Sequence, residues 1–272
     1  MCQRPVALLD SGMGGLPYLA WIQEHLPRES LVYLADRKNF PYGEKTPEQI
    51  TSSVLDASLL LREKFNIKVL VLACNTASVT ALDTLRKKLD VPVVGVVPAV
   101  KTAFERSRAG RVGVLATQRT IDDPYLQGLI NRFGDPGSVT CLAAPDIVRY
   151  VEEDYEGKDT TRRKQVLEPW SRSLKEAGVD ALVLGCTHFL HVDAALQELL
   201  GTDIQVVDSR DGVGRRLKWV LEQKNLLAQK RLKNDQLFIT YGPNSLESLE
   251  DLLEKYKKLS HTYLLDFGGV LS

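Results

Sequence analysis

Short apolar runs alternate along the chain with longer stretches in which apolar positions recur every three or four residues. Short runs are typical of buried strands, and the longer amphipathic stretches are typical of helices. Because the two kinds of segment alternate, we predict βαβ units and a parallel sheet. The predicted strands are residues 6–9, 31–34, 69–73, 93–97, 111–116, 139–142, 181–185 and 204–207. The predicted helices include residues 16–25, 46–65, 78–89, 160–177 and 194–199.

The predicted helix near Thr46 has a clear start signal. Thr46 suits the N-cap, Pro47 suits the first helical position, and Gln49 follows three residues after the cap. This combination is typical of a capping box with proline at the first position of the helix. We therefore expect the helix to begin directly after Thr46.

Two parts of the chain repeat the same order of features. Each opens with a strand that ends in small polar residues, at 10–12 and at 117–120, and continues to a strand that ends in a cysteine motif. A chain of 272 residues has room for one large or two medium domains. We predict an α/β fold with two pseudo-symmetric lobes, residues 1–98 with 209–272 and residues 99–208. Each lobe is expected to be a mostly parallel sheet flanked by helices, with the tail beyond residue 209 helical.

The two cysteine motifs carry the most chemical information. Cys74 follows the apolar residues 69–73, and Cys186 follows the apolar residues 181–185. Ligands of α/β sheets lie beyond the carboxyl ends of the strands, so we expect an active site between the lobes that both thiols reach. Helix amino termini and polar donors at such an edge lower a thiol pKa from about 8.5. Two thiols on opposite sides of one ligand suit racemisation, which works on both faces of a carbon.

The other two cysteines suggest no chemistry. Cys141 is interpreted as a small hydrophobic residue at a strand end, and Cys2 as a thiol without a role. No signal-peptide pattern is present, and the longest apolar runs fall short of the ~18 residues that span a bilayer. We therefore expect a cytoplasmic protein without membrane association, in which the four cysteines stay reduced.

A metal site is a weaker interpretation of the same residues. Cys74, Cys186, His188 and Glu152 are possible zinc ligands, but no Cys-x-x-Cys pair or other familiar ligand spacing occurs. Dinucleotide and Walker motifs are absent, and no lysine stands in an evident Schiff-base context. We expect neither a metal nor a cofactor.

Two loops have glycines near polar residues. Residues 10–15 place an acid before a glycine-rich turn and a helix start, where free N–H groups bind anions. The alternative is a tight turn that needs glycine for geometry alone. In residues 36–43, Pro41 fixes a turn and Gly43 lets a ligand approach the backbone. That second signal is weak by itself.

His188 stands two residues after Cys186, which favours a role in orienting the thiol or assisting as an acid over a purely structural role. Spacing alone does not distinguish Glu152 from other glutamates. The formal net charge is zero, so no overall field attracts nucleic acid, and we expect no nucleic-acid partner. The basic stretch at residues 210–233 is interpreted as a solvated helix face.

Four motifs together resemble those of the glutamate racemases, which are cofactor-independent amino-acid racemases: residues 10–15, 41–43, 73–77 and 185–188. They occur in the family's order and spacing, and the resemblance covers nearly the whole chain. It implies a two-lobed α/β fold that interconverts L- and D-glutamate and supplies D-glutamate for peptidoglycan synthesis. Dimers are common in the family, so the resemblance also implies a homodimer.

The resemblance assigns roles to individual residues. It implies that Cys74 and Cys186 are the two catalytic bases, that Asp10 and His188 assist them respectively, and that Glu152 is a supporting acid. The substrate-binding positions that it implies are Asp10, Ser11, Pro41, Tyr42, Gly43, Asn75, Thr76, Thr117, Thr120, Thr187 and His188.

Other functions remain open from the sequence. The motifs do not reveal the length of the substrate side chain, so a related racemase of aspartate or a hydantoin is an alternative. A non-catalytic regulator that binds an amino acid is a second alternative, and a thiol redox protein that uses Cys74 and Cys186 is a third.

Overall fold

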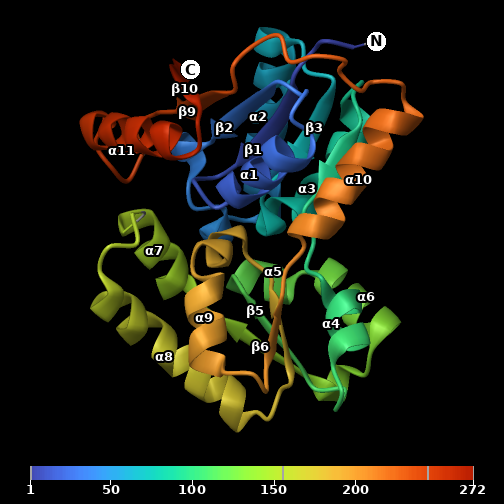
Figure 1. Ribbon diagram of the computed structural model, residues 1–272, viewed down its shortest axis with the longest axis vertical. Coiled ribbons are helices and arrows are strands. Elements are labelled where there is room, and N and C mark those ends of the chain that lie inside the picture. Colours follow the sequence, from blue (N-terminus) through green and yellow to red (C-terminus); the bar gives the residue numbers. More distant parts are fainter. Residues whose placement is uncertain (1, 155, 244, 272) are drawn as a thin grey trace. The chain divides into compact units, whose positions relative to one another are not determined.

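The computed structural model describes residues 2–154, 156–243 and 245–271 (Figure 1). The chain divides into two compact units, Met1–Val96 with Arg210–Ser272 (unit 1) and Val97–Ser209 (unit 2). Each unit contains one sheet of parallel strands with helices on its faces, so the predicted α/β class is confirmed. Among the described helices, none combines the length and the apolar character needed to cross a lipid bilayer.

Unit 1 is built on a sheet with the strand order β10-β9-β2-β1-β3-β4. Its strands are β1 (Val6–Asp10), β2 (Leu31–Ala35), β3 (Val69–Leu72), β4 (Val93–Gly95), β9 (Gln236–Thr240) and β10 (Asp266–Leu271). Its helices are α1 (Leu16–His25), α2 (Pro47–Phe65), α3 (Asn75–Lys88), α10 (Arg210–Gln223) and α11 (Leu249–Thr262), with the short 3-10 helices η1 (Arg37–Asn39) and η2 (Tyr42–Glu44). The inner strands are buried along their whole length, as expected for a parallel sheet covered on both faces.

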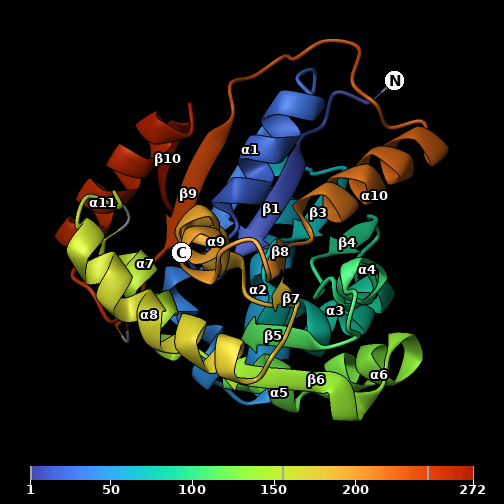
Figure 2. The same cartoon turned by 60° about the horizontal axis from the view of Figure 1, so that its bottom comes forward.

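The two faces of this sheet carry different helices. Alternate strand residues, such as Leu9, Leu34 and Leu72, pack in one cluster with apolar residues of α2 and α3. Helices α1 and α10 lie side by side on the other face (Figures 1 and 2). Because both faces are covered, polar side chains of the inner strands have room only at the strand ends.

Unit 2 repeats the central part of this arrangement with the strand order β6-β5-β7-β8. Its elements are α4 (Val100–Arg106), β5 (Val112–Ala116), α5 (Gln118–Asp122), α6 (Pro124–Phe133), η3 (Pro136–Ser138), β6 (Val139–Ala143), α7 (Pro145–Glu153), α8 (Thr160–Glu176), β7 (Ala181–Leu184), η4 (Thr187–His191), α9 (Asp193–Leu200) and β8 (Gln205–Val207). Residues of β5 and β7 pack against α4 and α6. Strands β5, β6, β7 and β8 thus occupy the same sheet positions as β1, β2, β3 and β4 in unit 1.

The predicted start of helix α2 is confirmed in detail. The Thr46 side chain accepts a hydrogen bond from the backbone N–H of Gln49, and the Gln49 side chain accepts one from the Thr46 N–H. Pro47 occupies the first helical position, where its missing N–H costs nothing.

The expectation of a helical tail is wrong in part. Residues 210–271 contain helices α10 and α11, but they also contain strands β9 and β10, which extend the sheet beyond β2. The sequence of β9 is a short apolar run and carries a strand signal. The sequence of β10 includes Gly268 and Gly269, which weaken that signal.

A buried ion pair in unit 1 holds the connector that follows α10 in place. The Lys68 ammonium lies 2.5 Å from a carboxylate oxygen of Glu29, and neither side chain is more than 2% exposed. Lys68 also donates to the carbonyl oxygens of Cys2 and Leu226, while Glu29 accepts from the N–H of Ala228. The pair therefore holds the connector that follows α10 against the amino-terminal segment and the start of β3.

Replacing one member of this pair should destabilise unit 1. We expect Lys68→Met to lower the free energy of unfolding by about 3–5 kcal/mol, because it leaves the Glu29 carboxylate buried without a cation. The measurement is urea denaturation followed by circular dichroism. The double variant Lys68→Met/Glu29→Gln should recover most of the loss. Asp90→Asn, which breaks the more exposed pair with Arg62, is the control and should have a much smaller effect. Equal losses in Lys68→Met and Asp90→Asn would contradict this interpretation.

Candidate active site

Cys74 and Cys186 occupy equivalent positions in the two units. Each lies two residues beyond the end of a strand, β3 for Cys74 and β7 for Cys186. Their backbone conformations agree closely, with φ −134° and ψ 124° for Cys74 and φ −138° and ψ 135° for Cys186. Each is the N-cap of the following helix, and their exposures are 7% and 6%. The same local fold thus presents a thiol at the carboxyl edge of each sheet.

The glycine-rich turn of unit 1 lies against the end of β3. Asp10 is fully buried, and its carboxylate accepts from the N–H of Gly12 at 2.7 Å and from the Ser11 hydroxyl at 3.4 Å. The Tyr33 hydroxyl donates to the Gly12 carbonyl and accepts from the Gly15 N–H. A Cβ at Gly15 would lie 2.8 Å from the Cβ of Ala73. The turn therefore needs glycine for close packing, and this packing brings Asp10 to the same edge as Cys74.

Asp36 organises the second loop of unit 1. Its buried carboxylate accepts from the Tyr42 hydroxyl at 2.6 Å, the Thr240 hydroxyl at 2.7 Å and the Asn39 amide at 3.0 Å. Burial raises the pKa of Tyr42 well above its usual range, and the negative charges of Asp36, Cys74 and Asp10 add to the shift. Tyr42 therefore stays neutral and directs its proton to Asp36. Its oxygen can accept a hydrogen bond from a ligand.

The three predicted substrate-binding residues in this loop, residues 41–43, differ in burial. Tyr42 is buried, whereas Pro41, which follows a cis peptide bond, and Gly43 are half-buried. Asp36 and Thr240 were not among the predicted site residues. Asp36 directly follows β2, and Asp10 is the last residue of β1. This repetition of an aspartate at a strand end could have identified Asp36 as a site residue from the sequence.

Asn75 and Thr76 form the start of helix α3 and are 2% and 3% exposed. Within the described part of the chain, neither the oxygen nor the nitrogen of the Asn75 side chain has a hydrogen-bond partner. Buried amides are rarely left in this state, since each unsatisfied group costs about 1–3 kcal/mol. The amide lies at a helix amino terminus, where the N–H groups and the helix dipole favour an anion. This arrangement suits the carboxylate of a ligand.

In unit 2, Cys186 belongs to a buried chain of three polar side chains. His188 Nδ1 lies 3.8 Å from the Cys186 sulfur, and His188 Nε2 lies 2.8 Å from a carboxylate oxygen of Glu152. Glu152, Cys186 and His188 are 5%, 6% and 3% exposed. This order of carboxylate, imidazole and thiol is the arrangement that orients a base and activates a nucleophile or proton acceptor.

The charge of His188 follows from these contacts. Burial lowers its pKa, but the hydrogen bonds with Cys186 and Glu152 and their negative charges outweigh burial and raise the pKa to about 10. At neutral pH the ring is therefore an imidazolium that donates to both neighbours. It carries a proton directly beside the Cys186 sulfur.

Glu152 lies in a helix. It is in the last turn of α7, where Ile147 and Val151 are buried against the rest of unit 2. The preceding residues 145–151 have apolar positions at helical spacing, so the sequence pattern could have predicted this helix. The pattern could not have predicted the contact between Glu152 and His188, which are 36 residues apart.

The remaining predicted positions of unit 2 lie near the ends of β5 and β7. Thr117 follows β5, and its hydroxyl caps α5 by accepting from the Thr120 N–H. Thr120 and Thr187 are buried. Cys141 lies in the middle of β6, not at its end, and burial raises the pKa of its thiol. In the described residues, no group of three or more Cys, His, Asp or Glu side chains is arranged to hold a metal ion.

Comparison with known families agrees with this geometry. The Asp/Glu/Hydantoin racemase family model matches residues 18–211, and this chain belongs to that family of racemases. It is therefore an isomerase of the amino-acid racemase type, as the sequence motifs indicated.

Several proteins similar to this chain are named glutamate racemases. The glutamate racemase of Pseudomonas putida strain W619 is 38% identical over 92% of this chain and 93% of its own length. The crystal structure of glutamate racemase isoform RacE1 from Bacillus anthracis has a TM-score of 0.85 and 27% identity, and the match covers 100% of this chain and 98% of that one. The Escherichia coli glutamate racemase, solved with L-glutamate and the activator UDP-MurNAc-ala, has a TM-score of 0.82 and 34% identity over 99% and 98% of the two chains.

The protonation of His188 can be tested directly. We expect the NMR signals of the His188 ring to remain those of an imidazolium at pH 8 and to titrate near pH 10. Glu152→Gln should lower this pKa, because it removes a negative charge 2.8 Å from Nε2. Glu153→Gln is the matched control, since Glu153 pairs with Arg162 at the exposed end of the helix. Titration of His188 near pH 6.5 in the unmodified protein would contradict the assignment.

Proposed function

We propose that this protein is a cofactor-independent glutamate racemase that uses Cys74 and Cys186 as its two bases. The observation that carries the proposal is the equivalent placement of two buried thiols at the carboxyl edges of parallel sheets. Cys186 lies beside His188, and Cys74 lies at the same sheet edge as Asp10. Chemistry on both faces of one carbon needs two such groups. The proposal requires that both sulfurs reach the same α-carbon from opposite sides.

Glutamate is proposed as the substrate for two reasons. The similar curated proteins are named glutamate racemases, and the Escherichia coli relative was solved with L-glutamate bound. The first half of the site also suits an amino acid. The Asn75 amide and the start of α3 favour a carboxylate, while the oxygens of Asp10 and Tyr42 can accept from an ammonium group.

The proposed reaction moves one proton at a time. A thiolate on one face removes the α-proton, and the electron pair left on the α-carbon is delocalised into the substrate carboxylate. Donors aimed at that carboxylate stabilise the developing charge, and Asn75, Thr76 and Thr187 are proposed for this role with Ser11. The thiol on the other face then donates its proton to the α-carbon. Each turnover inverts the substrate and exchanges the protonation states of the two cysteines.

The neighbouring groups are proposed to prepare the two thiols. His188, held by Glu152, is proposed to carry a proton beside the Cys186 sulfur and to exchange it with the thiol. Asp10 is proposed to assist Cys74 differently, as a carboxylate that can accept the thiol proton. Pro41, Gly43, Thr117 and Thr120 are proposed to shape the substrate site.

The biological setting is part of the proposal. D-Glutamate made by this reaction would enter peptidoglycan synthesis in the cytoplasm, and we propose that the protein works there as a homodimer. The similar proteins are named for glutamate racemisation, which is the reaction that would supply D-glutamate.

Substitution of either cysteine should abolish racemisation. We expect Cys74→Ala and Cys186→Ala each to lower kcat/KM by at least about 10³-fold in both directions, because one base cannot both remove and return a proton across the carbon. The measurement is circular dichroism of L- and D-glutamate in D₂O, with deuterium at Cα read by NMR. Cys141→Ala is the control and should keep full activity.

The same assay decides between the alternative functions. Loss of optical activity with deuterium incorporation from both enantiomers is the expected result. Turnover of aspartate but not glutamate would preserve the chemistry and reject the substrate. Undiminished turnover by either cysteine variant would reject the two-base mechanism.

Asn75 provides a test of substrate binding that is separate from the cysteines. Asn75→Ala removes no hydrogen bond within the described protein, so we expect the free energy of unfolding to fall by less than about 1 kcal/mol. We expect kcat/KM for glutamate to fall about 10- to 100-fold, as for one lost hydrogen bond to a charged group. Asn131→Ala, on the exposed side of α6, is the control. A variant that loses stability but keeps kcat/KM would contradict a binding role.

A further inference from the structure

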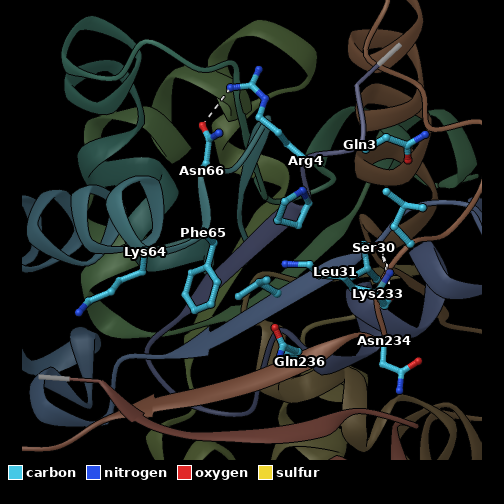
Figure 3. Close-up of a pocket in the computed structure, with 13 residues that line it drawn as sticks. Gln3, Arg4, Ser30, Leu31, Lys64, Phe65, Asn66, Lys233, Asn234 and Gln236 are labelled. Atoms are coloured by element: carbon cyan, nitrogen blue, oxygen red, sulfur yellow. Dashed lines mark hydrogen bonds between the residues drawn. The ribbon is translucent and has the colours of Figure 1, made fainter.

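A cavity of about 360 Å³ lies in unit 1 at the amino ends of β1, β2 and β9 (Figure 3). It is lined by residues 3–5, 30–32, 64–66, 232–234 and 236. Its volume is typical of sites for small molecules. Cys74 follows the opposite, carboxyl end of β3, so the sheet separates the cavity from the cysteine by roughly 15 Å, the length of a five-residue strand.

The charged residues that line the cavity are all positive. Arg4, Lys64 and Lys233 contribute to the lining, and the thirteen lining residues include no aspartate or glutamate. The Arg4 guanidinium donates to the Cys2 sulfur and to the Asn66 side chain. Within the described residues, none of the three cationic side chains is within ion-pair distance of a carboxylate.

Other cations near this end of unit 1 are neutralised. Arg62 pairs with Asp90, and Arg231 pairs with Asp235, whose carboxylate is fully buried. Lys68 likewise has its own buried carboxylate. The nearby carboxylates therefore already pair with other cations, and none of them neutralises the three cations of the cavity lining.

The cavity is pre-formed, because hydrogen bonds hold its walls. The Ser30 hydroxyl donates to the Lys233 carbonyl and accepts from the Lys233 N–H. The Leu31 N–H donates to the Asp235 carboxylate. Phe65, in the middle of the view in Figure 3, has its ring 4.8 Å from that of Phe238 in the core. These contacts hold the backbone of the walls, while Lys64 and Lys233 are exposed side chains that can turn toward a ligand.

We propose that this cavity is a second binding site, for a small organic anion with a flat apolar body. The apolar body would lie against Phe65, and the acidic group would pair with Arg4, Lys64 and Lys233. The side-chain amides of Asn234 and Gln236, in the lower part of the view in Figure 3, supply neutral donors. The site is distinct from that of the proposed function and does not depend on it.

Phenyl phosphate is the probe that matches this chemistry, because it joins an aromatic ring to a dianion. We expect saturable binding in isothermal titration calorimetry, weaker at high salt, and amide NMR shifts at Asn66 and Lys233. Benzyl alcohol, which has the ring without the charge, should not bind measurably. Glutamate at saturating concentration should not displace phenyl phosphate.

The double variant Arg4→Gln/Lys233→Gln should weaken binding of phenyl phosphate at least about tenfold. Lys164→Gln/Arg172→Gln, at exposed positions of α8 in unit 2, is the matched control and should bind normally. Equal binding by both variants, displacement by glutamate, or the absence of saturable binding to the unmodified protein would each overturn the proposal. NMR shifts confined to other residues would overturn it as well.

Discussion

Two equivalent hydrogen bonds set the positions of both cysteines. The N–H of Ala73 donates to the carbonyl of Leu9 at 2.8 Å, and the N–H of Gly185 donates to the carbonyl of Leu115 at 2.7 Å. Each bond is the last between the cysteine's strand and its parallel neighbour, so the next residue, the cysteine, emerges at the sheet edge. The preceding residue must be small, because a Cβ at Gly185 would lie 3.0 Å from the Cβ of Ala116. Parallel pairing also brings the ends of neighbouring strands, and thus Asp10, to the same edge.

Equivalent backbones nevertheless give the two thiols different electrostatic surroundings. Cys186 has the His188 ring beside it, and Glu152 holds that ring from its other nitrogen. Cys74 lies at the sheet edge where β1 ends in Asp10. The two thiols therefore have chemically different neighbours, an imidazole for Cys186 and a carboxylate for Cys74.

The sequence pattern predicted much of the fold and the two thiols, because both depend on local signals. Buried parallel strands appear as apolar runs, and Cys74 and Cys186 stand directly after two of them. Contacts between distant segments were out of reach of the pattern. Glu152 was selected by family resemblance, and its contact with His188 depends on how α7 packs against η4. Asp36 was missed because its importance lies in partners such as Thr240, 204 residues away.

The strands in residues 210–271 explain why the loop around Tyr42 depends on the last part of the chain. Strand β9 pairs with β2 and supplies the Thr240 hydroxyl to Asp36. Just beyond it, Glu247 pairs with the buried Arg37, which also lies over the ring of Phe40. The loop that carries Tyr42 is therefore held by residues from the last part of the chain. The Glu152–His188–Cys186 group, in contrast, joins residues no more than 36 positions apart, so it depends on a much shorter part of the chain.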